Sequence, residues 1–401
     1  MNRLKFVDFG ASIGIFLAYT GNYIYFPLLI AKLGAEYNGF LAGLVIFMTY
    51  VGRLSATFFY TYVSKKISIR NIISLFVLFE GLALFGMGWT SLPSVYMVLA
   101  YFIGFASGMS FPALKHALSI LPETIRLPAF SRFQLASQAG LIAGAVIGGL
   151  CAHFSMILIF STTFILFLGY SLVAFLFIPN SGEYQPVTTL EKIALIDMSL
   201  IRNRNFPAIK YDLVMSTLYW LLIMSFMVNI PLTISAYLPT LNVSMPFWLT
   251  GCVLLFLQMP LIKYAKTKLS APAIMMVGSS ALLIGFIAFS LHFSLGYIVI
   301  GSIMMALGQI LFAPALDLLV SQSVVKENMG KAMGAMHFYR SLGNLIGALF
   351  AGILFDLGKK LHFSELSWLF LVVIAVILTL AALRLWKIKS VAFRNSSALI
   401  S

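Results

Sequence analysis

The chain has 401 residues, of which 61% are hydrophobic and only 9% are charged, and its formal net charge at pH 7 is +14. A soluble globular protein carries charges on about 25% of its residues, so this composition excludes that class and predicts a protein embedded in a bilayer. Because a hydrocarbon core about 30 Å thick needs about 20 apolar residues per helix, apolar runs of that length are the expected elements.

Twelve such runs follow one another along the chain. In order, they cover residues 9–30, 39–62, 71–90, 95–114, 131–152, 156–178, 211–236, 245–262, 272–291, 295–320, 332–355 and 367–386. A membrane β-barrel would need strands of about 10 residues with strict alternation, whereas these runs are twice as long and continuous. We therefore predict an all-α membrane protein with twelve transmembrane helices.

Glycines recur at helical spacing in the fifth run and again about 200 residues later. The fifth run carries Gly140, Gly144, Gly148 and Gly149, and at an offset of 203 the eleventh run carries Gly343, Gly347 and Gly352. Small residues four positions apart let membrane helices bring their backbones together, because lipid offers no hydrophobic reason for association. The constant offset predicts two pseudo-symmetric six-helix halves, residues 1–179 and 209–401, joined by a cytoplasmic linker at 180–208.

Lysine and arginine are unequally distributed between the two sides of the predicted bundle. Of the 26, only Lys32, Lys359 and Lys360 share a side with the loop between helices 1 and 2, and Arg53 and Arg340 lie inside helices. Because cytoplasmic loops are rich in Lys and Arg, both termini are predicted to be cytoplasmic. The net charge then reflects membrane topology, and nucleic acid is not an expected partner.

A polar cluster lies deep in the first run. It contains Asn22, Tyr23 and Tyr25, and Asn229 takes the position of Tyr25 in the seventh run at an offset of 204. Polar side chains at this depth are expected to face a cavity or partner helices. For the tyrosines, a place in the interfacial aromatic belt is the alternative.

Two opposite charges lie in the second and third runs. Arg53 is about nine residues from the cytoplasmic end of its helix and Glu80 about ten from the start of the next, so at about 1.5 Å per residue their depths match. A charge in the bilayer is costly and normally has a partner or a function. Arg53 and Glu80 are therefore either a structural pair or groups that bind substrate and carry protons.

The second half carries its own intramembrane charges. Asp317 lies in the tenth run and Arg340 in the eleventh, with His337 one turn before Arg340. A local ion pair and a substrate site are again the alternatives, and Asp317 joins Glu80 as a candidate proton carrier. Further candidates for polar groups in the cavity are Gln258, Gln309 and Asn344.

The predicted loop between helices 2 and 3 is basic and contains Lys65, Lys66 and Arg70. The second half has basic residues at the matching place, so these turns either clamp the two halves or act only as topology determinants. The segment from Pro179 to Pro207 is the only long polar stretch, and it would allow the halves to rock in alternating access.

Nothing in the sequence predicts a catalytic site. Cys151 and Cys252 lie in apolar runs, so neither a disulfide nor a metal site is expected. Walker and HExxH motifs are absent, so we expect no cofactor and no enzymatic activity. An intramembrane enzyme or lipid scramblase is the rival class.

These features together resemble the major facilitator superfamily, most closely its twelve-helix drug:proton antiporter branch. Exporters of that family carry Gly-x-x-x-Gly-Pro-x-x-Gly-Gly in helix 5, and the segment from Gly140 to Gly149 matches it, with Ala145 in place of the proline. The family's basic pattern between helices 2 and 3 is degenerate here, since Ser64 stands where an aspartate is usual. Ala100 stands where the family has an arginine in helix 4.

The resemblance implies the major facilitator fold and a monomeric secondary transporter in a cell membrane, such as a bacterial inner membrane. We predict proton-coupled export of a small organic molecule by alternating access, with a carboxylate-bearing siderophore or metabolite as the substrate. Arg53 and Arg340 would close on the anionic group, because a guanidinium binds a carboxylate bidentately. Multidrug efflux of lipophilic compounds and proton-coupled uptake are the alternatives.

Overall fold

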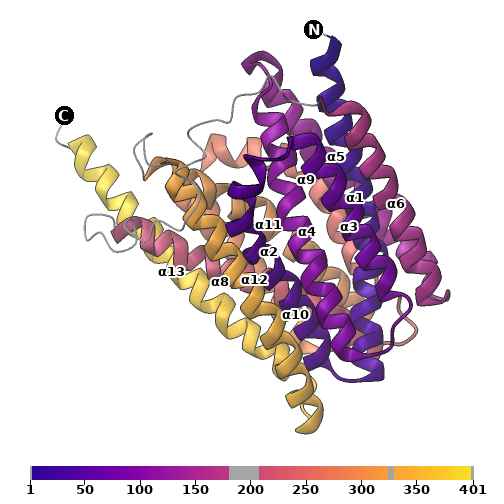
Figure 1. Cartoon of the computed structure of the whole chain (residues 1–401). Coiled ribbons are helices and arrows are strands. Elements are labelled where there is room, and N and C mark those ends of the chain that lie inside the picture. The colour runs from indigo at the N-terminus through magenta and orange to yellow at the C-terminus, as the bar shows by residue number, and fades with distance from the viewer. Residues whose placement is uncertain (1, 180–206, 324–328, 399–401) are drawn as a thin grey trace. The chain divides into compact units, whose positions relative to one another are not determined.

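The computed structural model describes residues 2–179, 207–323 and 329–398, and these form twelve α helices with no strand (Figure 1). Their bounds are α1 Asn2–Glu36, α2 Gly39–Ser64, α3 Ile69–Met87, α4 Pro93–Ser119, α5 Glu123–Leu150, α6 Met156–Phe177, α8 Pro207–Tyr237, α9 Met245–Lys268, α10 Ala271–Leu291, α11 Leu295–Gln322, α12 Met329–Lys360 and α13 Leu366–Ala398. All twelve contain a stretch long and apolar enough to cross a membrane. The predicted all-α fold with twelve transmembrane helices is confirmed.

The helices extend beyond the apolar runs, and this corrects the predicted loops. Lys115 lies in α4 and Arg126 lies in α5, although both residues fall between the apolar runs predicted from the sequence. A helix needs no apolar neighbours to continue its backbone hydrogen bonds, and long basic side chains can reach water from its last turns. α5 therefore begins directly after Pro122, and the connection to α4 is short.

Short polar caps set the starts of several helices. The Asn38 side chain accepts a hydrogen bond from the backbone N–H of Leu41 at 2.7 Å at the start of α2. Ser68 caps α3 and Ser155 caps α6 in the same way, each through its hydroxyl. Such caps satisfy backbone donors that a helix leaves unpaired, and they allow tight connections between antiparallel neighbours.

The chain divides into two compact units. Unit 1 comprises Met1–Leu195, Met227–Gly251 and Ala348–Ile353, and unit 2 comprises Ile196–Phe226, Cys252–Gly347 and Leu354–Ser401. Unit 1 thus contains α1 to α6 together with parts of α8, α9 and α12. The predicted linker at 180–208 falls almost entirely outside the described residues.

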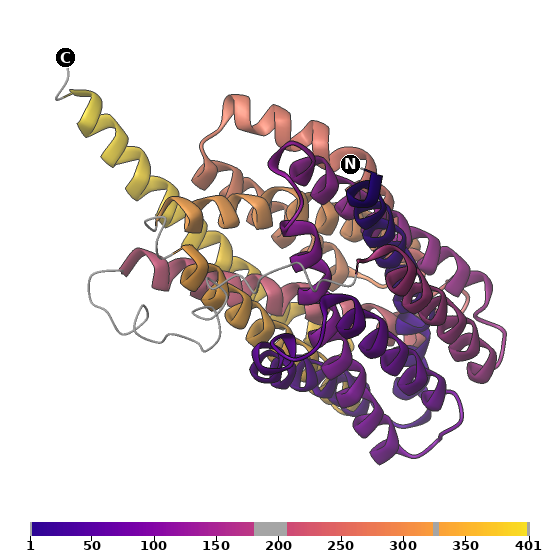
Figure 2. The ribbon, with the colours of Figure 1, turned by 45° about the horizontal axis from the view of Figure 1, so that its top comes forward.

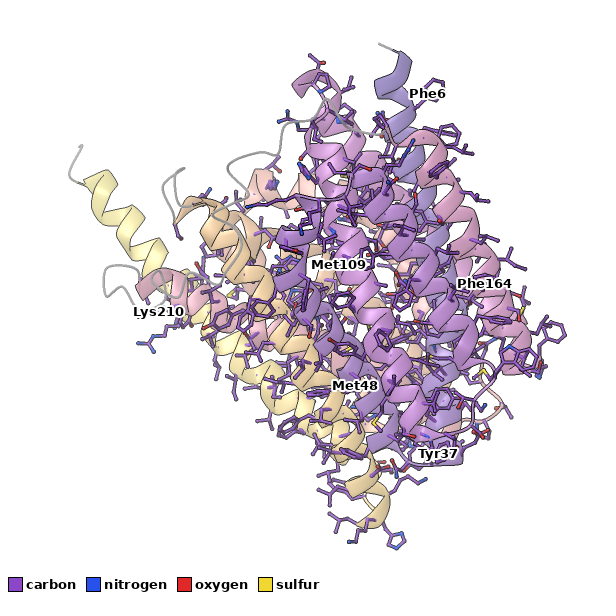
Figure 3. All side chains as sticks on the ribbon, viewed as in Figure 1. Phe6, Tyr37, Met48, Met109, Phe164 and Lys210 are labelled. Atoms are coloured by element: carbon purple, nitrogen blue, oxygen red, sulfur yellow. The ribbon has the colours of Figure 1, made fainter. Side chains whose placement is uncertain are left out.

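In unit 1, α1 packs against α5 and α6, α4 packs against α2 and α3, and α3 also packs against α6. The two views in Figures 1 and 2 show these helices running side by side. Figure 3 places Phe6 and Tyr37 at opposite ends of the bundle's longest helix, α1, with Met48 and Met109 at levels between them. At about 1.5 Å per residue, the 35 residues of α1 span about 52 Å, well beyond a 30 Å hydrocarbon core.

The glycine pattern of α5 is the surface that packs on α1. A Cβ added to Gly140, Gly144 or Gly148 would lie less than 3.0 Å from the carbonyl oxygens of Phe16, Thr20 and Ile24, respectively. The backbones of α1 and α5 can therefore approach closely only because these positions lack side chains.

Unit 2 repeats this packing on α8 and α12. A Cβ on Gly343 or Gly347 would lie less than 3.0 Å from the carbonyl oxygens of Thr217 and Leu221. The hydroxyl of Ser225 also donates a hydrogen bond to the carbonyl of Gly347 at 3.0 Å. The repeated glycine pattern in the sequence therefore corresponds to a repeated helix contact.

Candidate functional site

Arg53 is the central charged residue inside unit 1. It lies in α2, its Nη2 donates a hydrogen bond to the Ser107 hydroxyl of α4 at 3.0 Å, and its guanidinium carbon lies 5.2 Å from the centre of the Tyr50 ring. Its Nε is buried and has no hydrogen-bond acceptor in the described structure. The guanidinium therefore retains unused donors, and no carboxylate lies within ion-pair distance of it among the described residues.

Glu80 of α3 is 5% exposed and lies within electrostatic range of Arg53. Tyr25 of α1 and Tyr170 of α6 also interact electrostatically with its carboxylate. No ion pair joins Arg53 and Glu80 in the described residues, and Arg53 donates to Ser107. The two side chains are close enough to influence each other but remain separate groups.

Tyrosines surround Arg53. The rings of Tyr19 and Tyr23 stack with their centres 6.2 Å apart, and Tyr19, Tyr25 and Tyr50 lie within electrostatic range of the guanidinium. The Tyr25 hydroxyl donates to the side-chain oxygen of Asn22 at 3.5 Å. The structure thus brings the predicted residues Asn22, Tyr23, Tyr25, Arg53 and Glu80 together within unit 1, and we call this group the Arg53 cluster, with Tyr19, Tyr50 and Ser107 added.

In unit 2, the Arg340 guanidinium of α12 forms an ion pair with the Asp317 carboxylate of α11. The Arg340 side chain is 26% exposed and that of Asp317 is 46% exposed. The local ion pair, one of the two alternatives from the sequence, is therefore present. Arg340 is neutralised by its neighbour, which distinguishes it from Arg53.

Aromatic rings lie beside this ion pair. The Arg340 guanidinium carbon is 5.7 Å from the centre of the Trp220 ring of α8, and Tyr219 stacks on Phe312 with ring centres 4.8 Å apart. Tyr219 is also within electrostatic range of Arg340 and Asp317. The ion pair of unit 2 is therefore charge-balanced and lies next to aromatic side chains, of which Tyr219 and Phe312 are buried.

Asn229, Asn344, Gln258 and Gln309 make no hydrogen bond to either group in the described residues. Asn229 of α8 is fully buried, and neither its amide nitrogen nor its amide oxygen has a partner in the described residues. Asn344 of α12 is also buried, with an unpartnered side-chain oxygen. Gln258 and Gln309 are half-buried, and His337 is exposed.

The basic residues predicted for the second loop occupy the ends of α2 and α3. Lys65 is the C-cap of α2, and the Lys66 ammonium contacts the Tyr62 hydroxyl and lies 4.3 Å from the centre of that ring. Arg70 lies in the first turn of α3 with its guanidinium 4.6 Å from the centre of the Phe175 ring. Their contacts are local to unit 1.

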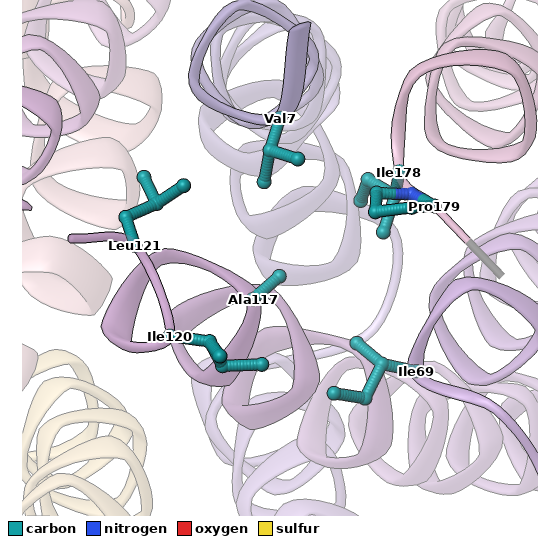
Figure 4. A pocket seen from close by; sticks show the side chains of 7 residues that line it. All are labelled: Val7, Ile69, Ala117, Ile120, Leu121, Ile178 and Pro179. Carbon is teal, nitrogen blue, oxygen red and sulfur yellow. The ribbon is translucent and has the colours of Figure 1, made fainter. Parts of the chain in front are cut away.

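A small pocket lies elsewhere in unit 1, between the ends of α1, α3, α4 and α6 (Figure 4). Its lining is entirely apolar and consists of Val7, Ile69, Ala117, Ile120, Leu121, Ile178 and Pro179. Without a polar side chain, this pocket has no means of recognising a charged solute. The Arg53 cluster is the better candidate site.

Several residues of these sites were not singled out from the sequence. Tyr50 precedes Arg53 by three positions, which puts both on one helix face and is a detectable signal. Ser107 and Trp220 had no such signal, because their contacts to arginines depend on how separate helices pack. The same holds for the ion pair between Asp8 of α1 and Arg132 of α5.

Among the described residues, no group of three or more His, Cys, Asp or Glu side chains could hold a metal ion, and Cys151 and Cys252 are both free thiols. The chemistry that the sites offer is therefore charge pairing, hydrogen bonding and ring stacking.

Twelve membrane-length helices with charged and polar side chains inside each unit are the architecture of a multi-pass membrane protein. The sequence model of the Major Facilitator Superfamily matches residues 11–348. The chain belongs to this superfamily, as its sequence features predicted, and the relatives described next are transporters rather than enzymes.

The chain is 24% identical to the MFS-type transporter YttB of Bacillus subtilis (strain 168), over 97% of this chain and 98% of YttB. It is 23% identical to the multidrug resistance protein MdtH of Escherichia coli (strain K12 / DH10B), over 63% of this chain and 61% of MdtH. The solved structure of the nucleoside transporter NupG has a TM-score of 0.75 and 14% identity, over 95% of this chain and 99% of that chain. This last likeness shows the fold alone.

Proposed function

We propose that the protein is a proton-coupled exporter of small organic anions. The observation that carries this proposal is the Arg53 guanidinium, which is held inside unit 1 by Ser107 and Tyr50 and has no ion-pair partner in the described chain. An arginine away from bulk water keeps its charge, so an anionic group is its natural ligand. Arg340, by contrast, already has Asp317 as its counter-ion.

Glu80 is the proposed proton carrier. Its carboxyl group is buried, has no hydrogen-bond donor among the described residues, and lies within electrostatic range of Arg53. A deprotonated Glu80 offsets the charge of Arg53, and a protonated Glu80 leaves that charge to the substrate. Proton binding and anion binding at this pair therefore favour each other, and because the two would then move in the same direction, this coupling by itself favours the alternative of proton-coupled uptake.

Export, rather than uptake, is supported by the glycine pattern of α5, which resembles that of exporters in this family. The match to the multidrug resistance protein MdtH supports the same direction, although it spans only 61% of that protein. Two further candidates remain from the sequence: efflux of lipophilic compounds, which the match to MdtH also favours, and proton-coupled uptake. A carboxylate-bearing siderophore or metabolite remains our preferred substrate type, in a bacterial inner membrane with both termini in the cytoplasm.

The test is transport in liposomes that contain the purified protein and an internal pH-sensitive dye. Citrate, benzoate and the lipophilic cation ethidium are supplied separately, with and without a pH gradient. We expect proton movement across the membrane when citrate or benzoate is supplied, but not when ethidium is supplied. In the Arg53→Gln variant, the anions should no longer cause proton movement. Lys268→Gln removes one positive charge from an exposed position and serves as the control.

Three outcomes contradict the proposal. Proton movement with ethidium alone would favour drug efflux, and anion flux that is indifferent to the pH gradient would exclude proton coupling. Substrate accumulation in cells that carry the gene, compared with a deletion strain, would favour uptake. Depletion from the cells and enrichment in the medium, measured by mass spectrometry, is the expected result.

A further inference from the structure

The residues around Arg53 restrict the type of anion that can bind there more narrowly than the positive charge of Arg53 does by itself. A guanidinium has five N–H donors, of which one is used by Ser107 and the buried Nε has no acceptor among the described residues. Glu80 lies within electrostatic range of Arg53, so its carboxylate would repel a second negative charge on a ligand. The cluster can therefore balance one anionic group, and a polycarboxylate would leave further carboxylates uncompensated.

The wall beside this charge is aromatic. Tyr19 and Tyr23 stack at 6.2 Å with their planes 25° apart, and the Tyr23 ring lies 6.4 Å from that of Phe26 and 6.1 Å from that of Phe247, all within unit 1. Tyr50 contributes a further ring below the guanidinium. Planar rings favour a planar aromatic partner, because offset stacking and edge-to-face contacts add to the simple burial of apolar surface.

The hydroxyl groups of this wall are available to a ligand. Tyr19, Tyr23 and Tyr50 are half-buried, and their hydroxyls make no hydrogen bond to the described protein. Each hydroxyl can donate one hydrogen bond and accept others, so a ring substituent such as a hydroxyl would find a partner. Tyr25 differs, because its hydroxyl already donates to Asn22.

From these features we infer that the substrate is an aromatic monocarboxylate, whose carboxylate is bound by Arg53 and whose ring lies against Tyr19 and Tyr23. This inference deepens the proposed function and rests on it. It narrows the sequence-based expectation of a carboxylate-bearing siderophore or metabolite, because one cation without an ion-pair partner in the described residues faces one aromatic wall. Arg53 selects the charge, and the two stacked tyrosines select the ring.

Four probe ligands distinguish recognition of the carboxylate charge from recognition of the aromatic ring. Benzoate has both features, cyclohexanecarboxylate keeps the charge without the aromatic ring, benzamide keeps the ring without the charge, and citrate has several carboxylates. Binding of each is measured by competition with radiolabelled benzoate on the purified full-length protein. We expect each of the other three to compete at least about tenfold more weakly than benzoate.

Two variants test which residues of the protein recognise the carboxylate and which recognise the aromatic ring. Arg53→Gln should abolish benzoate binding, whereas Tyr23→Leu should reduce the preference for benzoate over cyclohexanecarboxylate to about unity. The matched control is Tyr264→Leu, an exposed tyrosine of α9, which should leave the preference unchanged. Comparison of the four probes on the unchanged protein needs no variant, so a misfolded variant cannot obscure the result.

Equal competition by benzoate and cyclohexanecarboxylate would overturn the inference, as would tighter binding of citrate. Either result leaves the proposed function intact if a pH gradient still drives the anion. Loss of all gradient-driven anion flux, with benzoate binding retained, would instead overturn the proposed function. If benzamide bound as tightly as benzoate, Arg53 would not recognise the negative charge of the ligand. This result would also overturn the inference.

Discussion

The guanidinium of Arg340 in α12 and the carboxylate of Asp317 in α11 form an ion pair inside unit 2. Both groups are partly exposed, and Asp317 makes further interactions. The pair joins two neighbouring helices and leaves this region electrically balanced. Removing one partner would leave the other charge without compensation, which is more costly than removing both.

We therefore predict strong coupling between these two residues. Asp317→Asn and Arg340→Gln should each lower thermal stability, and the double variant should lose less than the sum of both. Adjacent ion-pair residues show coupling of about 0.5–3 kcal/mol in double-mutant cycles. The measurement is thermal unfolding in detergent, with transport as a second readout.

The control for this cycle combines Asp317→Asn with Arg132→Gln, since Arg132 has its own partner, Asp8. These two changes should be additive. Additive losses for Asp317 and Arg340 themselves would show that their ion pair has no energetic role. The same cycle on Arg53 and Glu80 should give smaller coupling, because no contact ion pair joins them.

A second prediction concerns proton coupling by Glu80. Glu80→Gln keeps the size of the side chain but cannot bind or release a proton. We expect this variant to fold and to bind the anion, but to transport it no faster with a pH gradient than without one. Glu36→Gln, at an exposed position that pairs with Lys32, is the control and should respond to the gradient normally. A normal response of Glu80→Gln would move proton coupling to another group.

A third prediction concerns the crossing of α2 and α4. A Cβ on Gly104 would collide with the carbonyl oxygen of Thr49, whereas nothing lies within 4 Å of a Cβ on Gly296. Overpacking costs about 1–3 kcal/mol, so Gly104→Ala should lower the unfolding temperature. Alanine is a better helix former than glycine by about 1 kcal/mol, so Gly296→Ala should leave it unchanged or raise it. The opposite order of the two unfolding temperatures would contradict this packing.

A fourth prediction concerns a hydrogen bond at the end of α5. The Asn242 side-chain amide donates to the carbonyl of Gly149 at 3.0 Å, and its oxygen accepts from the backbone N–H of Ser244 at 2.9 Å. This bond satisfies a carbonyl that the helix end leaves unpaired. Asn242→Ala should therefore loosen the chain around Cys151, which is half-buried and follows α5 directly.

The measurement is the labelling rate of Cys151 by a membrane-impermeant maleimide, in a Cys252→Ser background. We expect a several-fold faster reaction in Asn242→Ala, on the scale of one lost hydrogen bond of about 1 kcal/mol. Thr240→Ala changes an exposed residue of the same connection and is the control. An unchanged rate would show that Asn242 does not restrain the end of α5.

A fifth prediction concerns topology. The distribution of Lys and Arg predicts that both termini are cytoplasmic. Green fluorescent protein fused after Ser401 should therefore fluoresce, and alkaline phosphatase fused at the same place should be inactive. Fusions after His153, in the connection between α5 and α6, should behave in the opposite way. The reverse pattern would invert the orientation and the direction of the proposed transport.

The sequence by itself determined the class of fold. Twelve apolar runs became twelve helices because a bilayer leaves an unpaired backbone few alternatives to the α helix, and this constraint acts on each run separately. The glycine spacing in the fifth and eleventh runs likewise predicted close packing, since it depends on one helix face. The helix ends were less predictable, because helices such as α4 and α5 continue into charged sequence beyond the apolar core.

Only the tertiary structure decided which charges pair. Arg53 and Arg340 look alike in the sequence, each an arginine in an apolar run with an acidic residue in a neighbouring run. The structure pairs Arg340 with Asp317 but directs Arg53 to Ser107, so one cation is neutralised and the other is not. Depth along a helix can be counted from residues, but the direction of a side chain depends on the rotation of each helix against its neighbours. That rotation is set by packing across the whole bundle, which no single run contains.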